Sequence, residues 1–497
     1  MKKHLGIFGC LLLVFAMLLG TAGCKTDKNN PADTKSDSEE TEDIDLLADL
    51  PQGYFATEEG SSREFKILNN TSNYGLTIMD TESVSTTLDS EIFNRNRYIE
   101  EKLGILFDVT ELGFADNYTT MYNLTLAGTY NYDICYNEAW EQALLIQVDA
   151  YRKTSEYKDY IDLTKPWWYS DVIDNLSVFG NSYLIAGDMQ MMYNDSLWCL
   201  AVNNDIVEDH TGVTHPYDLV KSGDWTFDAL YQICVDTWVE DVNNPKYGVV
   251  TWHNFANAMM AAGEVKLIVK DEEKGLVQNT VDTHFVDVYG KLLTQFFTES
   301  GDGKLMGVRA SDKSENWNNF SEYLKKFQGV FTDGNATFMA GTVGDMRTYL
   351  IGSEMDYGIV PMPKYSADQK QYISYVYEGA ALCGIPTTIA EDDLQYVCTV
   401  LEWLCAYSYQ DIRPLYYDNI LHGRVAKDPT TVEMLDIVFG VDERGKAYME
   451  LDSMMKLGLA AVISTTVSNK DTAINSQVSS RADITNSTLE KTVEKYR

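Results

Sequence analysis

The sequence has little positive charge. It contains 39 Lys and Arg residues against 75 Asp and Glu residues, which gives a formal net charge of −36. Nucleic-acid binding is excluded, because a protein needs a basic face to neutralise phosphates. The same deficit argues against attraction to anionic lipid headgroups. The hydrophobic content of 45% still supplies enough apolar side chains for substantial cores, and a length of 497 residues predicts at least two lobes.

Metal-binding and redox motifs are also missing. No CxxC pair is present, and the histidines show no HExxH spacing. Gly301–Lys304 (GDGK) lacks the further ligands of an EF-hand and reads as a polar turn. No metal or cofactor is therefore predicted. Six cysteines have mostly apolar neighbours and are expected to be small buried core residues: Cys135, Cys199, Cys234, Cys383, Cys398 and Cys405.

Common catalytic motifs are absent as well. The chain has no GxSxG elbow, no Walker loop and no GxGxxG after a strand, so the activities that these motifs carry lack support. The many carboxylates leave glycoside hydrolysis open as an alternative. That reaction needs two carboxyl groups about 5 to 9.5 Å apart, and a sequence alone does not specify such a pair.

The first 23 residues have the features of a secretory signal peptide. Lys2 and Lys3 form a basic start, an apolar run covers Ile7–Leu19, and three small residues follow. The apolar run is shorter than the roughly 20 residues that span a bilayer. We therefore expect residues 1–23 to be removed on export.

Cys24 comes directly after the small residues, and this arrangement resembles a bacterial lipobox, with Thr21 where the pattern prefers leucine. The resemblance implies cleavage before Cys24 and attachment of diacylglycerol to its thiol. Residues 24–60 then form an acidic, polar tether. The implied location is the extracellular face of the cytoplasmic membrane, or its periplasmic side if the organism has an outer membrane.

Strand and helix patterns alternate along the first part of the chain. Short apolar runs near residues 64–68, 105–112 and 132–137 are separated by helical patterns at 90–103 and 117–126. This order predicts a βαβ-type parallel sheet. A second unit begins after about residue 188, and Thr226 is expected to cap one of its helices. Strands at 356–363 and 372–386 are expected to cross between two α/β lobes, and the remainder from 391 is mainly helical.

Aromatic residues are abundant, with 32 Tyr, 18 Phe and 9 Trp. Aromatic faces stack on sugar rings, while amides and carboxylates bind sugar hydroxyls. Several aromatics lie next to such polar residues at the ends of predicted strands, at residues 137–140, 252–254 and 377–378. Ligands of open α/β sheets bind outside the carboxyl ends of the strands. The joint location of these residues indicates a carbohydrate site.

Several segments, taken in order, resemble extracellular solute-binding protein family 1 of carbohydrate ABC transporters. The most specific part lies within residues 180–230, with Asn204-Asp205, the loop Gly212–Asp218 and the helix start Gly223–Asp228. RNRYIEEKLGILFDV, YDICYN, VFTDGNATFMAG and DYGIVPMPKY also resemble segments of that family. The resemblance implies a two-lobed periplasmic-binding-protein-like fold with crossing hinge strands, whose lobes close on a ligand by hinge bending.

The resemblance also implies lobe boundaries and partners. Lobe 1 would comprise residues 61–190 and about 365–425, and lobe 2 about 191–364 and 426–497. The partners would be a carbohydrate, namely an oligosaccharide in the inter-lobe cleft, and the permease subunits of an ABC importer. The protein would bind its ligand without turnover and would not be an enzyme. The membrane would be reached only through the N-terminal lipid, and the protein would be a monomer.

Ligand-binding residues are carried over from the resemblance by position: Asn70, Thr71, Asn137, Glu138, Trp140, Asp188, Trp252, Trp317, Arg347, Tyr377 and Glu378. Maltodextrin-binding relatives have a tryptophan where this chain has Thr342 and Val343, which argues against maltodextrin as the ligand. Two alternatives stay open, a surface-anchored glycoside hydrolase and a binding protein for peptides or another non-sugar solute.

Overall fold

The structure is a computed structural model and describes residues 46–497 apart from 57–60, 71–86, 130, 141, 191, 242, 244, 253, 299–327, 351–352 and 418–428. The predicted signal peptide, Cys24, Thr71 and Trp317 therefore lie outside the described residues. Among those that are described, no helix is long and apolar enough to cross a membrane.

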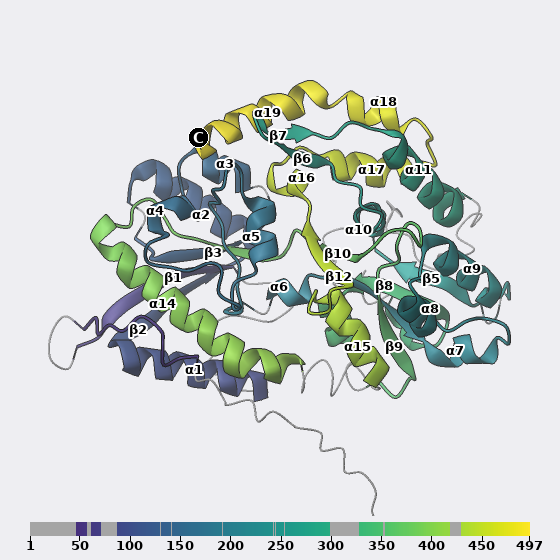
Figure 1. Cartoon of the computed structure of the whole chain (residues 1–497), viewed down its shortest axis with the longest axis horizontal. Coiled ribbons are helices and arrows are strands. Elements are labelled where there is room, and N and C mark those ends of the chain that lie inside the picture. The colour runs from purple at the N-terminus through teal and green to yellow at the C-terminus, as the bar shows by residue number, and fades with distance from the viewer. Residues whose placement is uncertain are drawn as a thin grey trace, which may run out of the picture. The chain divides into compact units, whose positions relative to one another are not determined.

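The first sheet has four strands in the order β11-β3-β1-β2 (Figure 1). Strand β1 runs parallel to β2 and β3, and β11 is antiparallel to β3. The predicted parallel βαβ arrangement is thus confirmed, because helices α1 and α2 connect the three parallel strands. The elements are β1 (Arg63–Asn70), α1 (Thr87–Leu103), β2 (Ile105–Leu112), α2 (Phe114–Ala127), β3 (Ile134–Glu138) and β11 (Ala381–Gly384).

The second sheet also has four strands, in the order β5-β8-β4-β9. Strands β5 and β8 are parallel, whereas β4 is antiparallel to both of its neighbours. The carboxyl ends of β5 and β8 consequently lie at the same edge as the start of β4. The strands are β4 (Trp198–Asn203), β5 (Tyr247–Thr251), β8 (Ala336–Thr342) and β9 (Tyr357–Pro361).

The chain passes between the two sheets in more than one place. After β9 in the second sheet it forms β10 (Tyr372–Val376) and then β11 in the first. Strand β10 pairs in parallel with β12 (Gly445–Met449). The segment that leads into β4 runs beside this crossing, since Ile185 bridges to Cys383 and Leu197 bridges to Val376. Crossing strands were predicted at 356–363 and 372–386. The chain does change sheets at 372–386, whereas the prediction for 356–363 was wrong, because that segment forms β9 and pairs with β4 inside the second sheet.

Helices make up most of the remainder, including the part after residue 391, as predicted. Thr226 caps α9, where its Oγ1 accepts from Ala229 N at 3.3 Å. The other elements are α3 (Gln142–Gln147), α4 (Thr154–Tyr157), α5 (Ser170–Leu176), α6 (Met192–Asp195), α7 (Asn204–Asp209), α8 (Pro216–Ser222), α9 (Phe227–Thr237), α10 (Phe255–Ala262), β6 (Ile268–Asp271), β7 (Gly275–Gln278), α11 (Thr283–Leu292), α13 (Val343–Tyr349), α14 (Leu394–Tyr407), α15 (Pro429–Val438), α16 (Leu451–Met454), α17 (Leu459–Ser468), α18 (Ile474–Ser479) and α19 (Ala482–Tyr496).

The first sheet is buried on both faces. Phe65 and Ile67 of β1 pack into a core shared with α1 and α14, while Leu68 faces a second core on the other side. This alternation follows from the two-residue period of a strand. The six cysteines expected in cores are all buried and free, which confirms that prediction.

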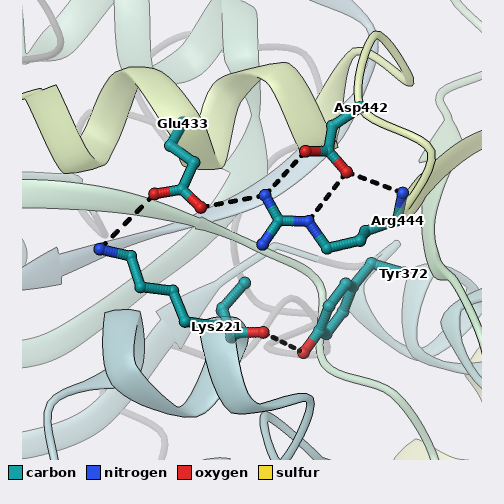
Figure 2. A network of polar contacts seen from close by, with 6 residues as sticks. Lys221, Tyr372, Glu433, Asp442 and Arg444 are labelled. Carbon is teal, nitrogen blue, oxygen red and sulfur yellow. Dashed lines mark hydrogen bonds and ion pairs between the residues drawn. The ribbon is translucent and has the colours of Figure 1, made fainter. Parts of the chain in front are cut away.

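A polar network connects helices α8 and α15 to the start of β12 (Figure 2). Glu433 of α15 pairs with Lys221 Nζ of α8 at 3.5 Å and with Arg444 Nη2 at 3.0 Å. The hydroxyl of Tyr372, the first residue of β10, donates to Val220 O of α8 at 3.2 Å. These contacts hold the crossing strands β10 and β12 against the helices that accompany the second sheet.

Gly445 at the start of β12 is a position where a methyl group should destabilise the fold. A Cβ added there would lie 1.8 Å from Ile437 O, and a backbone atom has little freedom to move away. We expect Gly445→Ala to lower the free energy of unfolding by about 1–3 kcal/mol. Chemical denaturation measures this change in the free energy of unfolding. Gly290→Ala in α11 is the control, because nothing lies within 4 Å of its added Cβ and the change favours the helix. Equal stabilities for the two variants would contradict the prediction.

Candidate functional site

Polar side chains from both sheets meet beside the crossing between β10 and β11. Asn70 ends β1, Glu138 ends β3, Trp252 follows β5, and Asp345 lies in α13 directly after β8. Carboxyl ends of parallel strands are the usual ligand-binding edge of open α/β sheets. We use the term central cluster for the following residues: Asn70, Glu138, Trp252, Asn254, Asp345, Tyr375, Tyr377 and Glu378.

Hydrogen bonds hold the carboxylates of the central cluster in place. Asn70 Nδ2 donates to Glu138 Oε1 at 3.3 Å. Glu378 accepts from two groups, Asn254 Nδ2 at 3.2 Å and the Tyr375 hydroxyl at 2.9 Å. Glu378 is thereby fixed by one residue after β5 and one from β10, whereas Glu138 is fixed from β1. The hydrogen bonds described for Glu138 and for Glu378 thus come from different strands.

Aromatic rings of the central cluster pack against one another and against Trp198 outside it. Trp252 stacks on Trp198 with 5.1 Å between ring centroids, and it meets Tyr377 edge to face at 5.0 Å. Trp198 reaches this point because it starts β4 and pairs with Thr342 at the end of β8. Both tryptophans are buried, while Tyr377 and Glu138 are half-buried. Tyr377 and Glu138 are therefore the members that a bound molecule could touch directly.

The carboxylates of the cluster titrate abnormally. The pKa of Glu138 is raised to about 7, mainly by burial; the Asn70 hydrogen bond opposes the shift and nearby Glu378 adds to it. Burial also raises the pKa of Glu378, and that of Asp345 to about 6. The pKa of Tyr377 is raised by burial and by all three carboxylates. These carboxylates therefore surround one phenol ring, in an environment that disfavours their charged forms.

A buried ion pair connects α6 to α13. Arg347 Nε and Nη2 donate to Asp195 Oδ1 and Oδ2 at 3.1 and 3.0 Å, and the Tyr416 hydroxyl donates to Asp195 Oδ1 at 2.6 Å. The Asp195 side chain is completely buried. A bidentate guanidinium and a phenol together satisfy this carboxylate.

A second buried carboxylate lies in the same region of the chain. Asp188 Oδ1 accepts from the Tyr169 hydroxyl at 3.0 Å, and Arg413 Nη1 lies 3.5 Å from Asp188 Oδ2. Burial raises the pKa of Asp188 to about 7, although Arg413 opposes the shift. Both ion pairs fall where the chain changes sheets.

Comparison with solved structures places this architecture among known folds. No protein-family profile and no curated protein matches the sequence. An ABC substrate-binding protein from Listeria monocytogenes, solved in complex with cycloalternan, has a TM-score of 0.55 and 12% identity, and the match covers 86% of this chain and 99% of that one. The sugar-binding protein MalE from Xanthomonas citri has a TM-score of 0.57 and 13% identity, with 86% and 98% covered.

A cyclic α-maltosyl-1,6-maltose binding protein from Arthrobacter globiformis has a TM-score of 0.57 and 9% identity, with 86% of this chain and 100% of that one covered. The chain has the fold of ABC-transporter substrate-binding proteins. The expected fold class, two-lobed α/β with crossing strands, is thereby confirmed. At these identities the likeness concerns the fold.

Within this substrate-binding-protein fold, five of the residues expected to bind ligand come together in the central cluster: Asn70, Glu138, Trp252, Tyr377 and Glu378. Asn137 lies beside it, where its Oδ1 accepts from Glu138 N at 3.0 Å and so supports the end of β3. Trp140 is 40% exposed. The other two described residues, Asp188 and Arg347, belong to the buried ion pairs. The ligand-binding role of every residue in this set stays a prediction.

Sequence reasoning did not select several residues that complete these clusters. Asn254 was noted beside Trp252 but was not carried into the set of ligand-binding residues. Tyr375 lies two residues before Tyr377, so a rule that includes every phenol near a strand end would have found it. Tyr416 and Arg413 carry no local signal, because their partners are more than two hundred residues away in the sequence.

Proposed function

We propose that the chain captures a carbohydrate between its two lobes and delivers it to an ABC importer. The observation that carries the proposal is the central cluster, where a stack of aromatic rings lies beside the hydrogen-bonding groups of Asn70, Glu138, Asn254 and Glu378. Such rings pack on the C–H face of a sugar, while amides and carboxylates bind its hydroxyls. The substrate-binding-protein fold supports a receptor that binds without turnover.

An oligosaccharide is the proposed cargo. Two solved neighbours are described by the cyclic glucans they bind, cycloalternan and cyclic maltosyl-maltose. A maltodextrin is disfavoured here, because this chain has Thr342 and Val343 where maltodextrin-binding relatives have a tryptophan, and Thr342 caps α13 by accepting from Asp345 N at 3.2 Å. We further propose that lipid on Cys24 anchors the exported protein to the membrane and that it docks to the importer as a monomer.

A thermal-shift screen of the unlipidated chain from residue 25 against neutral oligosaccharides tests the proposal. A ligand at about 100 times its Kd adds about 2.7 kcal/mol, which should raise the midpoint by a few degrees. Tyr377→Ala should abolish most of this shift, while Tyr160→Ala, which removes an exposed ring outside the cluster, should preserve it. No shift with any carbohydrate, or a shift with peptides alone, would refute the proposed function.

Glycoside hydrolysis is the second candidate, favoured by one observation. Glu138 and Glu378 lie close enough to affect each other, and the raised pKa of Glu138, about 7, is suited to a general acid. Reducing ends appearing during incubation with the bound oligosaccharide, and disappearing in Glu138→Gln, would favour this candidate over a receptor.

A further inference from the structure

Three carboxylates of the central cluster have no cationic partner. In the part of the chain that the structure describes, no lysine or arginine forms an ion pair with Glu138, Glu378 or Asp345. The buried carboxylates of Asp188 and Asp195 differ, because each has an arginine beside it. Buried charged carboxylates are normally paired, so each of these groups that ionises leaves a negative charge that no described cation balances.

A neutral group in the same place also has unused hydrogen-bonding capacity. Asn70 is 4% exposed and gives its amide N–H to Glu138, yet its Oδ1 has no hydrogen-bond partner among the described residues. Buried amide oxygens are nearly always satisfied. This oxygen is a hydrogen-bond acceptor, as are the carboxylates of Glu138 and Glu378. A positively charged ligand group that donates several hydrogen bonds could therefore bind all three.

A metal ion does not meet this requirement. Among the residues that the structure describes, no group of three His, Cys, Asp or Glu side chains is arranged to hold one. An ammonium group is the alternative, because it donates three hydrogen bonds and tolerates wider spacing between acceptors. It would also be stabilised beside the electron-rich face of Tyr377.

We propose that the ligand is an amino sugar whose protonated amine binds between Glu138 and Glu378. This inference rests on the proposed function, since Tyr377 would receive the sugar ring and the carboxylates would select its charge. Glu138 is half-buried and would contact the amine directly, whereas Glu378 is buried and is held in place by Asn254 and Tyr375.

Three tetrasaccharides of one linkage isolate the charge: β-1,4-linked glucosamine, N-acetylglucosamine and glucose. Calorimetric titration at pH 6.0 should show the glucosamine tetramer binding about 10- to 100-fold more tightly than the other two, since hydrogen bonds to charged groups are the stronger ones. Glu138→Gln should reduce that ratio to less than about threefold. Glu272→Gln, in the exposed turn between β6 and β7, removes the same charge outside the cluster and should leave the ratio unchanged. It thereby controls for general attraction to an acidic protein.

Proton release provides a readout that does not depend on affinity. At pH 6.0 Glu138 is mostly protonated because its pKa is about 7, and a bound ammonium would favour the carboxylate. Titrations in two buffers of different ionisation enthalpy should therefore detect up to about one proton released with the glucosamine tetramer. The glucose tetramer should release none, and neither should any ligand of Glu138→Gln.

The outcomes separate this inference from the proposed function. If a neutral oligosaccharide binds and the amine brings no gain, the inference fails and carbohydrate binding stands. If none of the saccharides binds in either assay, both fail. Spermidine binding as tightly as the glucosamine tetramer would overturn an amino sugar as the ligand, because a flexible amine without a ring would then suffice.

Discussion

Replacing Arg347 with methionine is expected to lower the free energy of unfolding by about 3–5 kcal/mol. The substitution leaves Asp195 completely buried with the Tyr416 hydroxyl as its remaining described partner, since both guanidinium hydrogen bonds are lost. An unpaired charge in the interior costs far more than the pair itself contributes. Urea denaturation at constant pH measures the loss.

Two further variants identify its cause. Asp195→Leu combined with Arg347→Met should recover most of the lost stability, because replacing both members of a buried pair with apolar residues is often neutral. Lys221→Met is the matched surface control: its ion pair with Glu433 is 3.5 Å long with both side chains over one third exposed, so the change should cost less than about 1 kcal/mol (Figure 2). A loss in Arg347→Met as small as in this control would contradict the prediction.

Glu138 should make the stability of the protein depend on pH. Its pKa is about 7 in the folded chain against an ordinary value of 4.5, so between these values the folded state binds more protons than the unfolded state. Stability then decreases as pH rises. We expect the wild type to lose about 2–3 kcal/mol relative to Glu138→Gln between pH 4.5 and 7, and less than about 0.5 kcal/mol more above pH 7. The groups that face Glu138 are Glu378, Tyr377 and the Asn70 amide.

Urea midpoints of both proteins at intervals from pH 4 to 8 test this dependence. The difference between the two curves is the quantity of interest, because other buried carboxylates titrate equally in both proteins. Glu272→Gln should follow the wild-type curve, since that side chain is exposed. Parallel curves for wild type and Glu138→Gln would show that Glu138 has the same pKa in the folded and unfolded states.

The central cluster could be anticipated in part because its members occupy recognisable places. Glu138 follows a predicted strand and Trp252 ends one, so the rule that ligands bind at the carboxyl ends of strands pointed to them, while Asn70 was carried over from the family resemblance. The roles of individual residues could not be anticipated in the same way. Arg347 was expected to face a ligand, yet the structure places its guanidinium on Asp195, 152 residues away in the sequence.

The sequence by itself determined the class of fold, the strands that build the first sheet, the Thr226 cap and the burial of six thiols. Each of these depends on residues close together in the chain, through periodicity, capping or local hydrophobicity. Only the tertiary structure decided which charges are paired. Asn254 reaches Glu378 across 124 residues and Asp195 reaches Tyr416 across 221, and no local pattern encodes such contacts. They arise because strands from distant parts of the chain end at one edge, where burial makes every unpaired charge costly.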